Sequence, residues 1–295
     1  MRGIVSAAML IALSDLGLAG AFDVVYGSSA GAINAAYFLQ GGRWDALALY
    51  YSELSGTNFI NPRRVLFGHP VVDLRFVRDA VLLGSRPIDY ETITESGVRL
   101  FVAVTNVDTC RCDIIGDFES SQDLAHALGA GSWLPILGGR PPIYRNHRYL
   151  DGGLLLSHPA SAALAGGCTH VVVLNTRYPR QRTRPELWRI LLRRYLNSLQ
   201  KGLGDEYWDE SVRTLNHRIQ LHNLASCEDS HVVTISPGQS WSEISRLERG
   251  VAQLLRAARE GYEAAIEGLT GERPRTAYAI TRVPAGLAPP THALQ

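Results

Sequence analysis

A serine lies between two glycines in the segment FDVVYGSSAGAINAAYF, residues 22–38. An apolar run before Gly27 predicts a short buried strand, and small apolar residues after Gly31 predict a helix. A serine at such a strand-to-helix turn, in the pattern Gly-x-Ser-x-Gly, is typical of the nucleophile elbow of hydrolases. We therefore interpret Ser29 as a nucleophile. The other interpretation is a tight turn whose serine only caps the helix.

A carboxylate with two flexible residues behind it is the best candidate partner for this serine. Asp151 follows the strand-like stretch YRNHRYL and precedes Gly152 and Gly153. A carboxylate within about 2.6–3.2 Å of the Ser29 hydroxyl accepts its proton directly. The alternative for this segment is an ordinary Asp-Gly turn.

The nine histidines leave a second catalytic arrangement open. His217 and His222 are the best candidates for a Ser-His-Asp triad. Both lie in a polar stretch with a helical pattern, which favours surface positions. An esterase of the α/β-hydrolase type therefore remains the alternative enzyme, although such proteins place several strands before their elbow, and here only one helix and one strand precede Ser29.

Strands and helices alternate along the chain, which predicts an α/β protein with three layers (α/β/α) and a mostly parallel central sheet. We expect helices over 4–16, 32–39, 43–54, 73–83, 121–130, 159–165 and 244–266, and strands over 22–26, 98–104, 144–150, 170–175 and 231–235. The first helix is apolar nearly all round, so it is expected to be buried on several sides.

Composition is that of an ordinary globular protein: 46% of the 295 residues are hydrophobic, 19% are charged, and the net charge is +1. No apolar run reaches the ~20 residues of a membrane-spanning helix. Four cysteines in a chain of this length make no disulfide framework, so we expect free thiols in the cytoplasm. Cys110 and Cys112 form only a Cys-x-Cys, so we expect no zinc site. We also expect no other metal and no cofactor. Met1–Ala21 resembles a signal peptide, and secretion is the alternative.

A basic segment over 177–201 holds seven arginines and one lysine against one acid. Its apolar residues recur at helical spacing, and Trp188, Arg189, Arg193 and Arg194 are candidates for contact with an anionic membrane surface. The alternative is a surface helix whose apolar face covers the body of the protein. Nucleic acid is not expected as a partner, because the patch is short and the remaining charge is balanced.

The sequence resembles the patatin-like phospholipases, in particular their bacterial members. The resemblance rests on FDVVYGSSAGAINAA, on the block from SWLPIL to YRNHRYLDGG, on HPASAALAGGCTHVVVLN and, more weakly, on ISPGQSW. It covers most of residues 1–237 in the right order. It implies a three-layer α/β/α fold, a lipid or acyl-ester substrate, and a Ser–Asp dyad in which Ser29 is the nucleophile and Asp151 the proton acceptor, with no cofactor.

The start of the chain departs from this pattern. The family opens with a buried strand and a loop of the form Gly-Gly-Gly-x-Arg-Gly, whose N–H groups form the oxyanion hole. Here only Met1, Arg2 and Gly3 match the end of that loop. The resemblance therefore implies that the strand and most of the loop lie upstream of Met1, and that Gly3 and Ala30 supply the remaining oxyanion donors. A lipid-binding relative with impaired catalysis is the non-enzymatic alternative.

Three parts are expected along the chain. Residues 1–237 form the catalytic domain, with a basic helical insertion over about 177–225. Residues 238–268 form a helix docked on the core, and the Pro-rich residues 269–295 form a flexible tail.

Overall fold

In the computed structural model of the protein, the described residues are 1–156, 159–178, 186–223, 231–238, 241 and 243–272. The strands are β1 (Val24–Ser28), β2 (Arg99–Asn106), β3 (Arg111–Ile115), β4 (Ile143–Tyr144), β5 (His147–Asp151), β6 (His170–Leu174) and β7 (His231–Ile235). The helices are α1 (Gly3–Asp15), α2 (Ala30–Leu39), α3 (Arg43–Tyr51), α4 (Tyr90–Glu95), α5 (Ser121–Gly131), α6 (Pro159–Ala165), α7 (Glu186–Leu199), α8 (Leu203–Asn223) and α9 (Val251–Thr270). The described residues also include two 3₁₀ helices, η1 (Pro62–Phe67) and η3 (Gly152–Leu154), and one π-helix, η2 (Phe76–Ser85).

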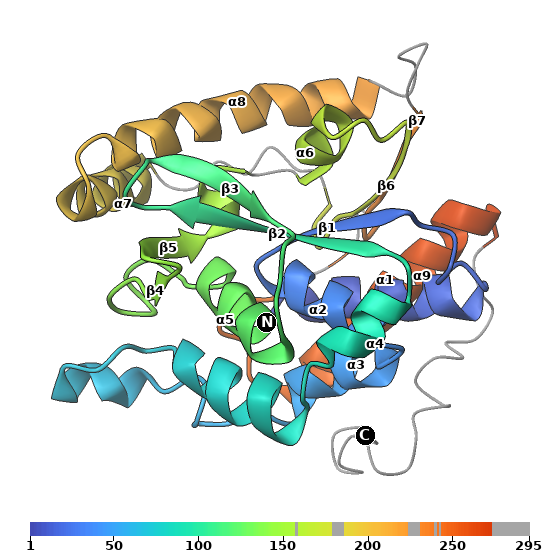
Figure 1. Cartoon of the computed structure of the whole chain (residues 1–295), viewed down its shortest axis with the longest axis horizontal. Coiled ribbons are helices and arrows are strands. Elements are labelled where there is room, and N and C mark those ends of the chain that lie inside the picture. Colours follow the sequence, from blue (N-terminus) through green and yellow to red (C-terminus); the bar gives the residue numbers. More distant parts are fainter. Residues whose placement is uncertain (157–158, 179–185, 224–230, 239–240, 242, 273–295) are drawn as a thin grey trace.

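The elements form three layers (Figure 1), as the sequence predicts. The strands occupy the middle, α6, α7 and α8 cover one face, and α1, α2, α5 and α9 lie on the other. Helix α1 packs against α2, α3 and α9, and its residues from Gly3 to Leu13 are all buried. Its apolar surface on every side is therefore explained by its place between other helices.

The central sheet is mixed rather than mostly parallel. β1 runs parallel to β2, whereas β3 and β5 run antiparallel to β2, and β4 pairs with β5. β3 was not expected, and the strand predicted over 144–150 is a tight hairpin whose turn residues Arg145 and Asn146 have φ of 43° and 65°. β6 and β7 pair in parallel as a separate two-stranded sheet.

The register brings the ends of β1 and β5 together. β1 pairs with β2 from Arg99 to Ala103, and β5 pairs with β2 from Val104 to Asn106. β3 pairs with the other edge of β2 from Val102 to Asn106, which includes the point where the β1 and β5 pairings meet. Because a strand has only two edges, β1 and β5 share one edge of β2 and run toward each other along it. Their last residues, Ser28 and Asp151, therefore face the neighbouring residues Ala103 and Val104.

Two helices differ from the sequence prediction. The helix expected over 244–266 begins only at Val251. The residues before it form a turn, in which the N–H of Glu248 donates to the Ser245 carbonyl and the N–H of Gly250 donates to Glu248 Oε1 at 2.7 Å. Ile244, in the expected helix, lies in this turn segment instead. The segment expected as an ordinary helix over 73–83 is η2, which has the wider π-helical winding. The predicted tail falls almost entirely on residues 273–295, outside the described residues.

Candidate active site

Ser29 occupies a sharp turn between β1 and α2. Its backbone has φ 55° and ψ −136°, a conformation that is rare and strained for a residue with a side chain. Gly27 makes this turn possible, because a Cβ there would lie 2.4 Å from Ala32 Cα. At Gly31 a Cβ would meet nothing within 4 Å. The two glycines of the motif therefore have different roles, and only the first is required by close packing.

Asp151 is held at the end of β5 by its backbone and its side chain. Its N–H donates to the Trp133 carbonyl at 2.9 Å, and its own carbonyl accepts from the Thr105 hydroxyl at 2.9 Å. The carboxylate is nearly buried, and Oδ1 accepts the N–H of Gly153 at 2.8 Å. Gly152 has no space for a side chain, since a Cβ would lie 2.1 Å from the Ala103 carbonyl oxygen. The Asp-Gly-Gly sequence thus fixes the carboxylate tightly against β2.

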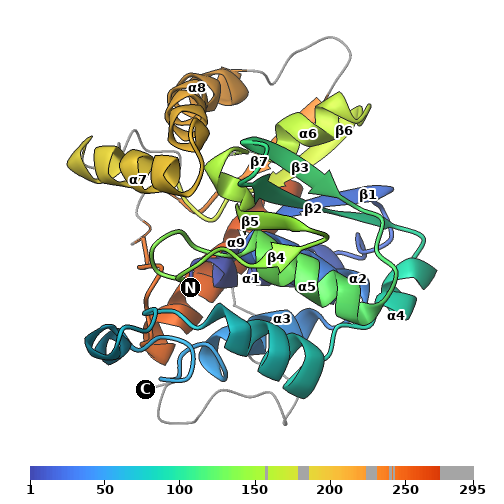
Figure 2. The ribbon, with the colours of Figure 1, turned by 60° about the vertical axis from the view of Figure 1, so that its left-hand side comes forward.

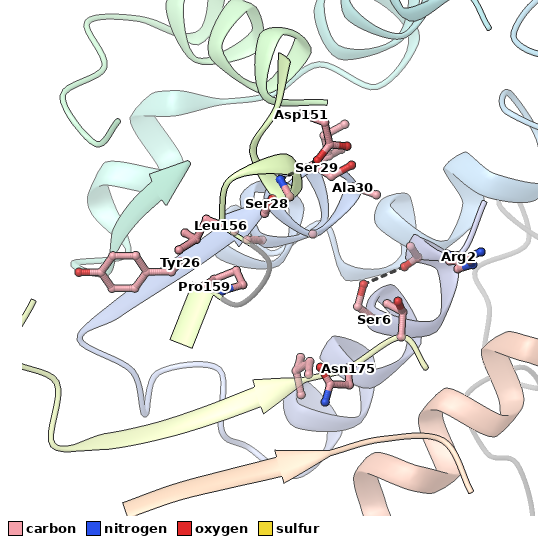
Figure 3. Close-up of a pocket in the computed structure, with 18 of the residues that line it drawn as sticks. Arg2, Ser6, Tyr26, Ser28, Ser29, Ala30, Asp151, Leu156, Pro159 and Asn175 are labelled. Atoms are coloured by element: carbon pink, nitrogen blue, oxygen red, sulfur yellow. Dashed lines mark hydrogen bonds between the residues drawn. The ribbon is translucent and has the colours of Figure 1, made fainter. Parts of the chain in front are cut away.

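The structure brings the two predicted residues to one place. Both line the same cavity, and Figure 3 shows the Asp151 carboxylate beside Ser29 at the start of α2. This follows from the register, because β1 and β5 end opposite adjacent residues of β2. A hydroxyl on a strained turn next to a nearly buried carboxylate is the arrangement that nucleophilic catalysis needs.

Gly3 and Ala30 also meet, as the expected oxyanion donors should. A Cβ on Gly3 would lie 2.6 Å from Ala30 Cβ and 2.1 Å from the Tyr50 hydroxyl oxygen. These residues open α1 and α2, so two helix N-termini converge beside Ser29. The N–H groups of Ile4, Val5 and Ala32 in these first turns already donate to the carbonyls of Met1, Arg2 and Ser29. Helix N-termini favour negative charge. Arg2 lies further out and pairs with Glu243 at 3.0 Å.

A buried polar network behind Ser29 was not predicted. Asn34 is fully buried in α2; its Nδ2 donates to the Gly3 carbonyl at 2.8 Å and to Ser6 Oγ at 3.0 Å, and its Oδ1 accepts from the Tyr50 hydroxyl at 3.0 Å. Burial raises the pKa of Tyr50 well above its usual range, so this hydroxyl stays a neutral donor. The network fixes the start of α1 against α2. A lone asparagine in the apolar run AINAAYFL was the available signal.

Ser28 is a second hydroxyl at the site. Its Oγ is buried and has no hydrogen-bond partner in the described part of the chain. A Cβ on Gly153 would lie 3.8 Å from this oxygen and 3.1 Å from Asp151 Oδ1, so Ser28 faces the same glycine as the carboxylate. A buried polar atom without a partner is unusual and marks a place where a ligand or water is accommodated.

The cavity next to Ser29 measures about 1470 Å³, larger than most small-molecule sites. It runs between β1 and β6, which belong to different sheets. Most of its wall is apolar, with contributions from α1, α2, α6 and α7, including Leu10, Leu13, Phe38, Trp188 and Leu192. An apolar cavity of this size next to a hydroxyl and a carboxylate suits a long acyl chain.

The structure places the predicted membrane-contact residues on α7, where some of them face α8. The Arg189 and Arg193 guanidinium groups lie 4.3 and 5.5 Å from the centre of the Trp208 ring, and Arg193 also pairs with Asp205. Arg194 is exposed, and Trp188, 40% exposed, also lines the cavity. The helix therefore both covers the body, through buried Leu192 and Leu196, and presents apolar and basic side chains outward.

The alternatives for other residues have different outcomes. Positions 217 and 222 lie in α8, as the helical pattern predicts, and their side chains are outside the described residues. Cys110, Cys112 and Cys168 are free thiols. Burial, with the charges of Asp113 and Glu210, raises the pKa of Cys112 to about 12. Within the described residues, no cluster of three or more His, Cys, Asp and Glu side chains is placed to hold a metal ion, and no helix is long and apolar enough to cross a bilayer.

In this α/β/α fold, a strained serine and a carboxylate therefore lie together beside a mostly apolar cavity. The family model of patatin-like phospholipases matches residues 1–164, more than half of the chain. This protein therefore belongs to the patatin-like phospholipase family.

Individual relatives are distant. The chain is 30% identical over 134 residues to patatin-like phospholipase domain-containing protein 2 of Rattus norvegicus, which covers 44% of this chain and 27% of the rat protein. It is 23% identical over 223 residues to the uncharacterized protein YjjU of Escherichia coli, covering 74% of this chain and 58% of that one. It is also 33% identical over 64 residues to a mouse omega-hydroxyceramide transacylase, covering 21% and 11%. The chain thus spans about a quarter of the rat relative.

Proposed function

We propose that the protein hydrolyses carboxylic esters of lipids through an acyl-enzyme formed on Ser29. The Ser29 oxygen attacks the ester carbonyl while Asp151 accepts the hydroxyl proton. That proton passes to the departing alcohol, which leaves the acyl group on the serine. Water then attacks the acyl-serine and gives a proton to Asp151. Asp151 passes this proton to the Ser29 oxygen as the bond to the acyl group breaks, which releases the fatty acid and restores the Ser29 hydroxyl. The observation that carries this proposal is the convergence of β1 and β5, which puts the two side chains at one point.

The charge that develops on the carbonyl oxygen needs hydrogen-bond donors. Gly3 and Ala30 are our candidates, since they open α1 and α2 in direct contact beside Ser29. The convergence of two helix N-termini supports this assignment, because both dipoles favour negative charge there. Losing one oxyanion donor costs about 10²–10³ in rate in a well-studied hydrolase. The remaining motif residues, Gly152 and Gly153, orient the carboxylate.

We also propose residues 1–237 as the catalytic domain. Helix α9 follows this domain in the chain and packs along the buried helix α1.

The test of the proposed function compares Ser29→Ala and Asp151→Asn with the parent protein on phospholipid, lysophospholipid and soluble p-nitrophenyl esters. Both variants are expected to lose at least about 10³ of kcat/KM, because one lacks the nucleophile and the other its base. His217→Ala and His222→Ala are the controls and should retain full activity. Loss of activity in a histidine variant, with retention in Asp151→Asn, would favour the Ser-His-Asp esterase instead.

A further inference from the structure

The short helix η1 exposes three consecutive large apolar side chains. Val65, Leu66 and Phe67 are 59%, 82% and 77% exposed. We call these three residues the apolar tip. Isolated exposed apolar residues are common on protein surfaces, but a contiguous run of them marks an interaction site. In Figures 1 and 2, η1 projects from the body at the lower left.

The apolar tip is held in place by the segments on either side of it, residues 58–61 and 70–73, which we call the neck. The Asn61 side chain caps η1 by accepting the N–H of Arg63 at 3.1 Å, and Ile60 and Val72 form a β-bridge across the neck. Arg64 donates to the Asn58 carbonyl at 2.9 Å and lies 3.6 Å from Asp73. These contacts fix an ordered projection whose apolar end points away from the core.

The neck of this projection is part of the cavity wall. Phe59 and Val72 line the cavity, and the N–H of Val72 donates to the carbonyl of Leu137, another lining residue, at 3.1 Å. Next to Leu137, Ile136 is 40% exposed. Buried apolar residues therefore connect the base of the projection to the wall of the cavity beside Ser29.

Positive charge accompanies the apolar tip. Arg63 is exposed within η1 itself, and Arg140 is exposed next to Gly139, where a Cβ would lie 3.7 Å from Pro70 of the neck. Helix α7, with exposed Leu187 and Trp188, lies on the same side of the molecule as η1 in both views (Figures 1 and 2). Exposed apolar side chains with two exposed arginines, Arg63 and Arg140, nearby are complementary to the head-group region of an anionic lipid layer.

We propose that the apolar tip inserts into a lipid surface that contains anionic lipid and thereby holds the cavity against that surface. Arg63 and Arg140 pair with lipid phosphates while Leu66 and Phe67 enter the boundary between head groups and acyl chains. The proposal rests on the proposed function only in that the substrate is a lipid in this surface. Docking itself requires no chemistry at Ser29.

Vesicle co-sedimentation of the full chain carrying Ser29→Ala tests the docking apart from hydrolysis. The vesicles contain phosphatidylcholine with or without phosphatidylglycerol. A tip variant, Leu66→Ser with Phe67→Ser, is compared with a control that removes two exposed apolar side chains on strands β3 and β7, Ile114→Ser with Val233→Ser. Thermal unfolding of each variant verifies that it is folded.

The tip variant is expected to bind vesicles with phosphatidylglycerol about tenfold or more weakly than the parent, because two large side chains no longer leave water. The control should remain within about twofold, and parent binding should weaken without phosphatidylglycerol or at high salt. Equal binding of tip variant and parent, or no binding of the parent, would overturn the proposal. The proposal would also be overturned if the parent protein formed a dimer without lipid and the tip variant did not. The apolar tip would then bind a second copy of this chain instead of a lipid surface.

Discussion

Replacing Asn34 with leucine tests whether the buried network positions the start of α1 for catalysis. The change removes three hydrogen bonds, to Gly3, Ser6 and Tyr50, at a fully buried position. At about 1 kcal/mol for each bond, the loss of stability is about 3 kcal/mol, and more if the Tyr50 hydroxyl stays unsatisfied. For a chain of this size that lowers the Tm by about 6 °C or more. The released Gly3 carbonyl should also lower kcat about ten- to a hundredfold, less than complete loss of an oxyanion donor.

Asn106→Leu is the matched control. Asn106 is 2% exposed and also makes three hydrogen bonds, donating to Asp113 and accepting the N–H groups of Asp108 and Thr109 in the turn after β2. Circular dichroism should show a comparable fall in Tm for both variants, whereas hydrolysis of a soluble p-nitrophenyl ester should lose kcat only in Asn34→Leu. An unchanged kcat in Asn34→Leu, or equal losses in both variants, would refute the positioning role.

Two further predictions follow from the same geometry. Gly27→Ala should abolish ester hydrolysis, because its Cβ would lie 2.4 Å from the Ala32 backbone, whereas Gly31→Ala should keep activity and raise the Tm slightly; an inactive Gly31→Ala would show that the second glycine is needed after all. Cys112 should react with iodoacetamide at pH 8 about a thousandfold more slowly than in unfolded protein, because a pKa of about 12 leaves little thiolate; peptide mass spectrometry measures this, and equal labelling rates would contradict it.

The positions of Ser29 and Asp151, each at the end of a strand, were predictable because the signals for them are local. Ser29 and Asp151 each lie in a short motif of small residues next to an apolar run, and each motif specifies its own turn. The pairing of β1 and β5 on one edge of β2 was not predictable from the same signals, because it depends on register between segments that are far apart in sequence.

Other features were missed for the same physical reason. Asn34 looked like an exception in an apolar helix, and its importance depends on Gly3 and Tyr50, which come from α1 and α3. The half-exposed strand β3 carries little apolar patterning, so tertiary pairing with β2 determines it. The apolar tip is an unremarkable tripeptide in the sequence, and only its exposure distinguishes it.

The central claim, that Asp151 alone activates Ser29, is tested most directly by a fluorophosphonate that forms a stable adduct with an activated serine. Intact-mass and peptide measurements should find one adduct, on Ser29, with none in Ser29→Ala. Its rate should fall about a hundredfold or more in Asp151→Asn and remain unchanged in His217→Ala and His222→Ala. An adduct on another residue, or a Ser29 adduct that forms at the parent rate in Asp151→Asn, would contradict the account.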